Sequence, residues 1–339
     1  LEGLEIIPIS MEEIEKLEIA HPFIENRKSQ VVFADYVEAT SGTGIVHTAP
    51  GHGLEDYQTG LNYNLDIYCP VDREGRYTSD YKEMEGVRVT DANPKIIEIL
   101  KNNGRLFYKE DISHSYPICW RCKNPLIFRA TDQWFMNMKH DNIDERTVKS
   151  LENIKWYPIW GHDRMKKMLD NRPDWCLSRQ RSWGVPIPAF YCKKCGKTLL
   201  TSESTKHFAE IVKAKGMDIW FELEPKDLLP AGTKCECGSD EFGKEEDILD
   251  VWFDSGVSSF ASQKTNKDLD GNFPVEIYLE GGDQYRGWFQ AAIWPSMAIR
   301  GIPPYKELIT HGWTLDENGK AMHKSAGNVV SPLDVIDKY

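Results

Sequence analysis

A lysine and a serine late in the sequence lie in a loop whose composition suits phosphate binding. The segment ENGKAMHKSAGNVVSP, residues 317–332, places Lys324 and Ser325 between Gly319 and Gly327. Glycines on both sides let the backbone approach a ligand closely. A solvated hairpin turn is the alternative explanation, and this segment alone favours the turn.

Four of the cysteines form two tight pairs with the spacing of a metal site. The segment YCKKCG supplies Cys192 and Cys195, and the segment KCECGS supplies Cys235 and Cys237. Two such turns brought together offer four thiolates, the closed set that holds structural zinc. Four reduced thiols without a metal are the alternative. The sequence predicts a Zn²⁺ site that stabilises a small module and does no chemistry.

A third close pair has no obvious partner. Cys119 and Cys122 lie in CWRCKNP, while Cys69 and Cys176 are isolated. Two explanations stay open: the pair is metal-free, or it is half of a second zinc site whose other half lies in sequence outside this chain. We expect the second.

Length and composition narrow the class of protein. The chain has 339 residues, 40% of them hydrophobic, so we expect two or three folded domains. The net charge of −12 argues against non-specific nucleic-acid binding, although residues 171–173 and 179–181 are candidates for a local basic surface. No apolar run approaches the roughly 20 residues of a membrane helix, and no signal peptide is visible. We expect a cytoplasmic protein and, because there is no initiator methionine, a piece of a longer chain.

Hydrophobic periodicity predicts mixed α and β structure. From residue 247 onward, apolar strands and helices alternate as in the second half of a parallel α/β sheet, which binds ligands at its strand ends. Residues 132–188 are rich in Trp, Arg and Pro and are expected to join domains. The expected strands are 30–37, 42–50, 275–281 and 306–315, and the expected helices are 54–63, 93–104, 204–215, 284–301 and one starting at 331–332.

Six segments, taken together and in order, resemble the class I aminoacyl-tRNA synthetases, and specifically the isoleucyl-tRNA synthetases. They are GIVHTAPGHGLEDY, HSYPICWRCKNPLIFRATDQWF, NRPDWCLSRQRSWGVPIP, DILDVWFDSG, YLEGGDQYRGWF and THGWTLDENGKAMHKSAGNVVSP. The resemblance implies four regions: the C-terminal part of a mixed α/β editing domain at 1–135, a return into the catalytic domain at 136–190, a zinc-ribbon-like module at 191–245, and the second half of a Rossmann-like catalytic domain at 246–339.

The resemblance also implies an activity. Isoleucine and ATP, with Mg²⁺, form isoleucyl-adenylate, and the acyl group then passes to tRNA(Ile). One methylene separates isoleucine from valine and is worth only about 1–3 kcal/mol, so mischarged valyl-tRNA(Ile) has to be hydrolysed at a second, editing site. A monomer without membrane contact is implied.

Candidate adenylate-binding residues follow two predicted strands. Carboxylates and an amide suit the ammonium and ribose groups of the ligand, and adjacent glycines allow close approach. Trp288 and Trp252 either wall the isoleucine side chain or pack in the core. By resemblance, the contacts to isoleucyl-adenylate come from Glu280, Gly281, Asp283, Gln284, His311 and Gly312.

The loop at 317–332 resembles the KMSKS loop of the family. Lys324 aligns with the lysine that stabilises charge developing on the ATP phosphates, and Ser325 aligns with the final serine. Ala321 stands where the first lysine is usual, and His323 replaces a serine. Lys320 is a candidate for the missing charge.

The editing assignment depends on HTAPGHGLEDY. By resemblance, Asp56 anchors the α-ammonium of a mischarged aminoacyl group, and His47, at a predicted strand end, lies beside the ester. His47 and His52 as metal ligands are a weaker alternative, because no third ligand is nearby.

Some family elements are absent from these residues. The HIGH signature, the threonine-rich editing segment and the anticodon-binding domain do not occur, so we expect the 339 residues alone to form no adenylate. Three rival functions remain: a valyl-tRNA synthetase, a non-catalytic zinc-stabilised RNA-binding relative, and a free-standing deacylase.

Overall fold

The computed structural model describes residues 8–38, 40, 43–119, 122–170, 172–269 and 271–338. The chain divides into two compact units, Leu1–Asp132 and Gln133–Tyr339. In the described part of the chain, no helix is long and apolar enough to cross a lipid bilayer.

The first unit consists of short elements around a small core. Tyr81, Met84 and Ala92 are buried, and Phe23 and Ile24 pack against them. The elements are α1 Met11–Glu15, β1 Glu18–Ala20, β2 Lys28–Gln30, α2 Leu54–Asn62, η1 Lys82–Met84 and α3 Val89–Asn102. Strands β1 and β2 pair antiparallel in a sheet of their own.

Two strands expected in this unit do not form. Strand β2 ends at Gln30, so residues 31–38 are not a strand, and residues 43–49 form none either. Their β-branched and aromatic side chains favour a strand only where a neighbouring strand supplies partners, and among the described residues no strand pairs with these segments. The expectation that His47 ends a strand is therefore wrong.

The helices of the first unit are close to expectation. Helix α2 confirms the predicted helix at 54–63. Helix α3 begins at Val89, earlier than the predicted cap at Asn93, so Pro94 lies inside the helix. Proline has no backbone N–H, so one hydrogen bond to a carbonyl of the preceding turn is lost. The packing of Ile96 against the core helps to offset that loss.

Three parallel strands form the main sheet of the second unit. They are β4 Lys155–Tyr157, β11 Val275–Gly281 and β12 Tyr305–His311, in the order β11-β12-β4. Helix α11, Trp288–Arg300, connects β11 to β12, because parallel neighbours need a crossover. This confirms the strand–helix–strand pattern predicted after residue 247.

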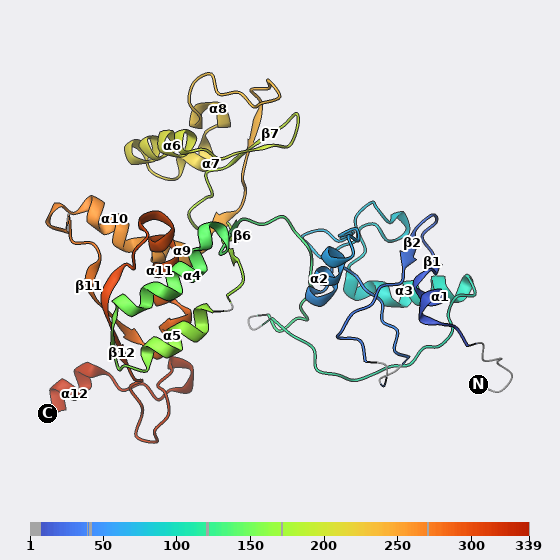
Figure 1. The fold of residues 1–339 in the computed structure, drawn as a ribbon, viewed down its shortest axis with the longest axis horizontal. Coiled ribbons are helices and arrows are strands. Elements are labelled where there is room, and N and C mark those ends of the chain that lie inside the picture. The colour runs from blue at the N-terminus through green and yellow to red at the C-terminus, as the bar shows by residue number, and fades with distance from the viewer. Residues whose placement is uncertain are drawn as a thin grey trace. The chain divides into compact units, whose positions relative to one another are not determined.

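Helices pack against one face of this sheet. The register partners Tyr278 and Leu308 point to the same face and are buried in a core that includes Trp294 of α11. Ile277 and Leu279, which alternate with Tyr278 along β11, are 51% and 55% exposed. Figure 1 shows helices gathered around the strands, among them α4 Ile143–Ser150, α5 Gly161–Leu169 and α9 Val251–Gly256.

A second core lies in the four-cysteine module, residues 190–244. Trp220 is the centre of that core, with ring centroids 5.3 Å from Phe190 and 5.1 Å from Phe208. The module folds as a three-stranded antiparallel sheet in the order β8-β7-β9, with three helices (Figure 1). Its elements are β7 Phe190–Cys192, β8 Thr198–Leu199, α6 Ser202–Lys215, α7 Ile219–Glu222, α8 Pro225–Leu228 and β9 Phe242–Lys244.

Two short antiparallel pairs complete the second unit. Strand β3, Phe135–Met136, pairs with β5, Trp175–Cys176, and strand β6, Ser178–Arg179, pairs with β10, Ile248–Leu249. The helix predicted at 331–332 is confirmed as α12. The remaining elements are η2 His140–Asn142, η3 Leu151–Asn153, α10 Ser258–Thr265, η4 Lys267–Leu269, η5 Gly282–Arg286, η6 Lys324–Ala326 and α12 Pro332–Lys338.

Candidate active site

The carboxyl ends of β11 and β12 lie side by side. Glu280 pairs with Thr310, and Gly281 pairs with His311 in the parallel register. A Cβ atom placed on Gly281 would lie 3.5 Å from Cε1 of His311, so the imidazole stands next to the glycine. The structure thus brings two of the predicted ligand-binding strand ends together, at the edge where parallel sheets bind ligands.

The turn after β11 holds Asp283 and Gln284 in different ways. Gln284 Oε1 accepts a hydrogen bond from the backbone N–H of Trp288 at 2.8 Å, at the start of α11, and its Nε2 donates to Asp283 at 3.0 Å. The Gln284 amide therefore positions the turn. A Cβ atom on Gly287 would lie 2.5 Å from Gln284 Oε1, so a larger residue there would have to displace the Gln284 amide.

The two tryptophans near this turn differ. Trp288 stacks on Tyr278 with ring centroids 4.1 Å apart and an interplanar angle of 11°, and its indole N–H donates to the Ser255 carbonyl at 3.1 Å. Trp288 therefore packs against the core. Trp252 is 42% exposed, and its ring edge would be 3.0 Å from a Cβ atom on Gly287. Of the pair, Trp252 is the better placed to wall a ligand.

The loop at 317–332 is a braced turn. Asp316 accepts hydrogen bonds from the backbone N–H groups of Asn318 and Lys320 at 2.9 and 2.8 Å, and from Asn328 Nδ2 at 2.7 Å. The bond from Asn328, together with the backbone donors, lowers the pKa of Asp316. Asn328 Oδ1 in turn accepts from the N–H of His323 at 2.9 Å.

The key lysine of this loop points to solvent. Lys324 is exposed and opens the short η6 turn. In the part of the chain that the structure describes, no hydrogen bond or ion pair joins Lys324 to Glu280 or His311. The Ser325 side chain lies outside the described residues. That Glu280, His311 and Lys324 meet around one ligand stays a prediction.

Asp56 lies in the first turn of α2, where its carboxylate is held in place. Oδ2 accepts from the backbone N–H of Ala49 at 3.0 Å, and the Tyr36 hydroxyl lies 3.5 Å from Oδ1 and 3.2 Å from Thr59 Oγ1. His47 is exposed in the preceding loop. The loop before α2 and the helix itself are thus tied together through this one carboxylate.

His52 has a different role. Its Nδ1 lies 2.9 Å from the carbonyl oxygen of Phe128, which links two distant parts of the first unit. Among the described residues, neither His47 nor His52 belongs to a group of three or more potential metal ligands.

The four predicted zinc ligands do come together. The sulfurs of Cys192, Cys195, Cys235 and Cys237 all lie within 4.8 Å of one another. The two short sulfur–sulfur contacts, Cys192 to Cys237 and Cys195 to Cys235, are both 3.5 Å. Each pair sits on a tight turn in which a glycine with positive φ follows, Gly196 at 72° and Gly238 at 84°.

The electrostatics of this cluster favour a thiolate at one position. Burial raises the pKa of Cys192, but the backbone N–H groups of Cys195 and Lys194 and the Cys237 thiol outweigh it and lower the pKa to about 6. At Cys195 the backbone N–H of Lys197 lowers the pKa, while the neighbouring thiols and burial raise it to about 12. Four sulfurs this close cannot all ionise without a cation, which is the situation that a divalent metal resolves.

The third cysteine pair lies in the first unit. Cys119 and Cys122 flank two residues outside the described part of the chain, and a turn is closed by bonds from Cys119 N–H to Asn124 and from Lys123 N–H to Cys119, both 2.8 Å. A second site at this pair stays a prediction.

Asp250 is a buried residue to which the sequence analysis gave no role. It is 4% exposed, and Oδ2 accepts from Trp175 Nε1 at 2.9 Å and from Arg179 Nη2 at 2.8 Å, while Oδ1 caps α9 through the Trp252 N–H at 3.2 Å. It therefore sets the position of Trp252. The signal in the sequence is an aspartate directly before a helix, a typical cap.

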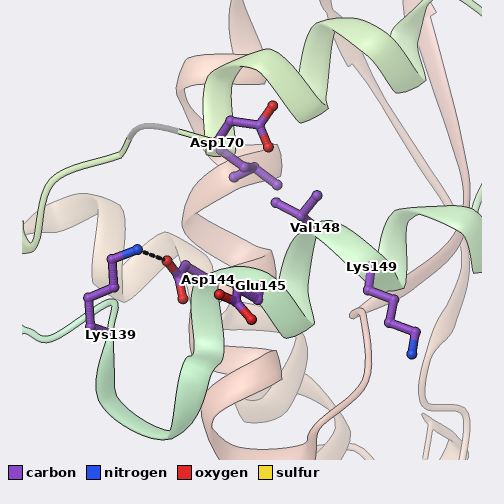
Figure 2. Close-up of a pocket in the computed structure, with 7 residues that line it drawn as sticks. Lys139, Asp144, Glu145, Val148, Lys149 and Asp170 are labelled. Atoms are coloured by element: carbon purple, nitrogen blue, oxygen red, sulfur yellow. Dashed lines mark hydrogen bonds and ion pairs between the residues drawn. The ribbon is translucent and has the colours of Figure 1, made fainter.

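A hollow of about 390 Å³ lies away from these residues. Figure 2 shows it beside α4 and the end of α5, with Lys139 bound to Asp144 at its rim. Its lining mixes Lys139 and Lys149 with Asp144, Glu145 and Asp170 around Val148 and Leu169. No predicted ligand-binding residue contributes to it.

The fold and these sites define the class of protein. Residues 8–339 match the model of the tRNA synthetases class I (I, L, M and V), and the chain belongs to this family.

The curated relatives of the chain carry a more specific name than the family does. The chain is 83% identical over 338 residues to an isoleucine–tRNA ligase of Brachyspira hyodysenteriae, covering 100% of this chain and 37% of that protein. It is 51% identical over 320 residues to the isoleucine–tRNA ligase of Petrotoga mobilis, covering 94% and 35%. The chain thus spans little more than a third of the length of these relatives.

Solved structures show weaker likeness. A LeuRS–tRNA–LeuAMS complex from Agrobacterium radiobacter K84 is 24% identical with a TM-score of 0.35, covering 49% of this chain and 23% of that one. A Mycobacterium tuberculosis methionyl-tRNA synthetase bound by methionyl-adenylate is 14% identical with a TM-score of 0.40, covering 67% and 35%. Scores of this size support no conclusion about this chain.

Proposed function

We propose that this chain is part of an isoleucine–tRNA ligase, which joins isoleucine to tRNA(Ile) at the expense of ATP. The observation that carries the proposal is the 83% identity over 338 residues to an enzyme of that name. The paired strand ends at Glu280–Thr310 and Gly281–His311 supply the ligand-binding edge that the reaction needs.

The amino acid end of the ligand binds at the turn after β11. The carboxylates of Glu280 and Asp283 attract the α-ammonium group of isoleucine, and Gln284 holds the turn through its bond to the Trp288 N–H. Gly281 keeps the space beside Asp283 open. The exposed ring edge of Trp252 provides an apolar wall for the aliphatic side chain.

The nucleotide end binds next to it. His311 and Gly312, at and after the end of β12, face the ribose and adenine of ATP. Lys324 stabilises the negative charge that develops on the phosphates as pyrophosphate leaves, with Mg²⁺ as the second source of positive charge. The exposed position of Lys324 on a braced turn lets its long side chain reach across to a bound nucleotide.

Hydrolytic editing is a second step of the same proposed function. Asp56 anchors the ammonium of a mischarged valyl group, and the bonds from Ala49 and Tyr36 hold its carboxylate in one orientation. His47 lies beside the ester. Replacing Asp56 with Asn should leave isoleucine activation intact and slow the deacylation of valyl-tRNA(Ile), which a filter assay with labelled valine measures.

Zinc is the proposed cofactor of the four-cysteine module. The residues fit a tetrahedral site, because four sulfurs lie within 4.8 Å on two opposed turns. Zinc held by these four cysteines would stabilise the module and would take no part in the reaction. We further propose that the protein is a cytoplasmic monomer whose partners are tRNA(Ile), isoleucine and ATP.

ATP–pyrophosphate exchange by the full-length protein that carries this chain tests the proposal. Isoleucine should support exchange far better than valine, and the isolated 339 residues should support none. Preference for valine would favour a valyl-tRNA synthetase, and no exchange with any amino acid would favour a non-catalytic RNA-binding relative. Deacylation without exchange would indicate a free-standing deacylase.

A further inference from the structure

The side chain of Trp183 is almost fully exposed to solvent. Its side chain is 92% exposed, and within the described residues no other large hydrophobic side chain is more exposed. The neighbouring Arg181, Ser182 and Gly184 are exposed as well. An indole normally buries a large apolar area and is enriched at binding surfaces, so its display in water points to a partner.

The exposure is not a sign of a loose loop, because both ends of the loop at 180–185 are fixed. Before it, Arg179 pairs with Ile248 in the β6–β10 ladder and donates to the buried Asp250 at 2.8 Å. After it, Pro186 forms a bridge to the same Ile248. A Cβ atom on Gly184, whose φ is 157°, would lie 2.3 Å from Cδ1 of Ile248, so any other residue there would have to displace the end of the Ile248 side chain.

Within the described ranges, some arginines beside the loop are bonded to other side chains, and one is not. Arg172 and Arg179 belong to the segments predicted as basic surface, but Arg172 donates to Gln290 and Arg179 to Asp250. Arg181 donates only to the backbone carbonyl of Gln180, at 3.1 Å, in the interactions described for it. In a chain with a net charge of −12, Arg181 is thus a local cation placed two residues from an exposed indole.

An aromatic ring with an adjacent guanidinium suits single-stranded RNA. Unpaired bases stack on aromatic side chains, and arginine neutralises the phosphate between them, whereas bases inside a duplex have no free face. An apolar protein segment fits less well, since the residues directly before Trp183, namely Gln180, Arg181 and Ser182, are polar or charged.

We infer that the loop at 180–185 contacts an unpaired stretch of RNA, with a base stacked on Trp183 and its phosphate paired with Arg181. This inference rests on the proposed function for its RNA, a tRNA, and names a contact surface within it. The 3′ end of a tRNA is unpaired and therefore offers this chemistry.

The test compares two reactions of the full-length protein that carries this chain. Trp183→Ala should weaken tRNA binding about 5- to 150-fold, the range for loss of one base–aromatic stack, and should raise the KM for tRNA in aminoacylation. Isoleucine-dependent ATP–pyrophosphate exchange, which needs no tRNA, should stay within twofold of wild type. Trp183→Phe should recover most of the affinity, because phenylalanine keeps a face for stacking.

Arg181→Gln tests the phosphate contact. The slope of log Kd against log salt concentration should fall by about 0.7, the value for one phosphate of a single strand. Phe221→Ala removes another exposed aromatic side chain, 60% exposed, from the four-cysteine module. It is the matched control for Trp183→Ala and should change neither the salt slope nor the Kd.

Each outcome decides one proposal. Unchanged tRNA affinity of Trp183→Ala beside normal exchange would overturn this inference alone. Equal loss of exchange and of tRNA binding would also overturn it, because the residue would then support the fold. Failure of the wild-type protein to show isoleucine-dependent exchange would instead overturn the proposed function.

Discussion

Gly281 and His311 are register partners at the carboxyl ends of β11 and β12, and the glycine leaves room that both His311 and Asp283 border. A Cβ atom on Gly281 would lie 2.8 Å from Oδ1 of Asp283. Gly281→Ala should therefore displace the Asp283 carboxylate and lower kcat/KM for isoleucine in ATP–pyrophosphate exchange roughly 10- to 100-fold.

The neighbouring glycine is the matched control for this prediction. A Cβ atom on Gly282 would meet Thr310 Cγ2 at 3.7 Å, an ordinary contact. Gly282→Ala should keep nearly normal exchange. Equal losses in both variants would show that the turn as a whole, rather than the space beside Asp283, matters.

Lys324→Gln should reduce the exchange rate about 100- to 1000-fold, because one charge that stabilises developing phosphate charge is removed. Substrate binding in the ground state should change less than kcat. Lys320→Gln is the comparison: its backbone N–H bonds Asp316 and stays in place in the variant. A large loss in Lys320→Gln would show that this lysine supplies the charge missing at Ala321, and a normal rate in Lys324→Gln would contradict the proposed role.

Removal of the metal should destabilise the second unit. Elemental analysis of the purified protein should find zinc, and a strong chelator should lower the midpoint of thermal unfolding, since metal binding contributes directly to the stability of such a module. Cys235→Ser should abolish this response to chelator. Cys69→Ser, outside the cluster, should keep it, and a zinc content that Cys235→Ser leaves unchanged would refute the site.

The stability of the second unit should depend on pH through Glu245. Burial raises the pKa of this carboxyl, but hydrogen bonds from the Trp134 indole, at 2.7 Å, and the Tyr191 hydroxyl outweigh it, so the pKa is lowered from 4.5. The folded state thus binds the proton more weakly than the unfolded state. The stabilisation is fully present above pH 4.5 and is lost as the pH falls through the lowered pKa.

Glu245→Gln should consequently lower the free energy of unfolding by about 1.5–3 kcal/mol at pH 7, the usual range for bonds to a charged group. The difference from wild type should shrink towards pH 3. Glu210→Gln, at an exposed position on α6, is the control and should match wild type at both pH values. A difference that does not vary with pH would rule out the ionised carboxylate as the cause. Burial and the bond to Glu245 raise the pKa of Tyr191 to about 12, so its hydroxyl stays a donor throughout.

Local patterns in the sequence determined several elements of the second unit. Strand 275–281 and helix α12 are found where periodicity and capping residues predict them, because such signals depend on neighbours within a few residues. The cysteine pairs were predictable in the same way, because each tight turn involves residues that are close in the sequence. The family motifs added the proposed roles of Glu280, Lys324 and Asp56, which stay predictions.

Only the tertiary structure decided which of these side chains face solvent and which are bonded to a buried residue. Arg179 and Arg181 look alike in the sequence, yet one binds the buried Asp250, distant in sequence, while the other faces solvent beside Trp183. Likewise, the segment before Asp56 has the composition of a strand but lacks a partner strand. Burial, pairing and charge compensation depend on residues brought together from far along the chain, and no local pattern contains that information.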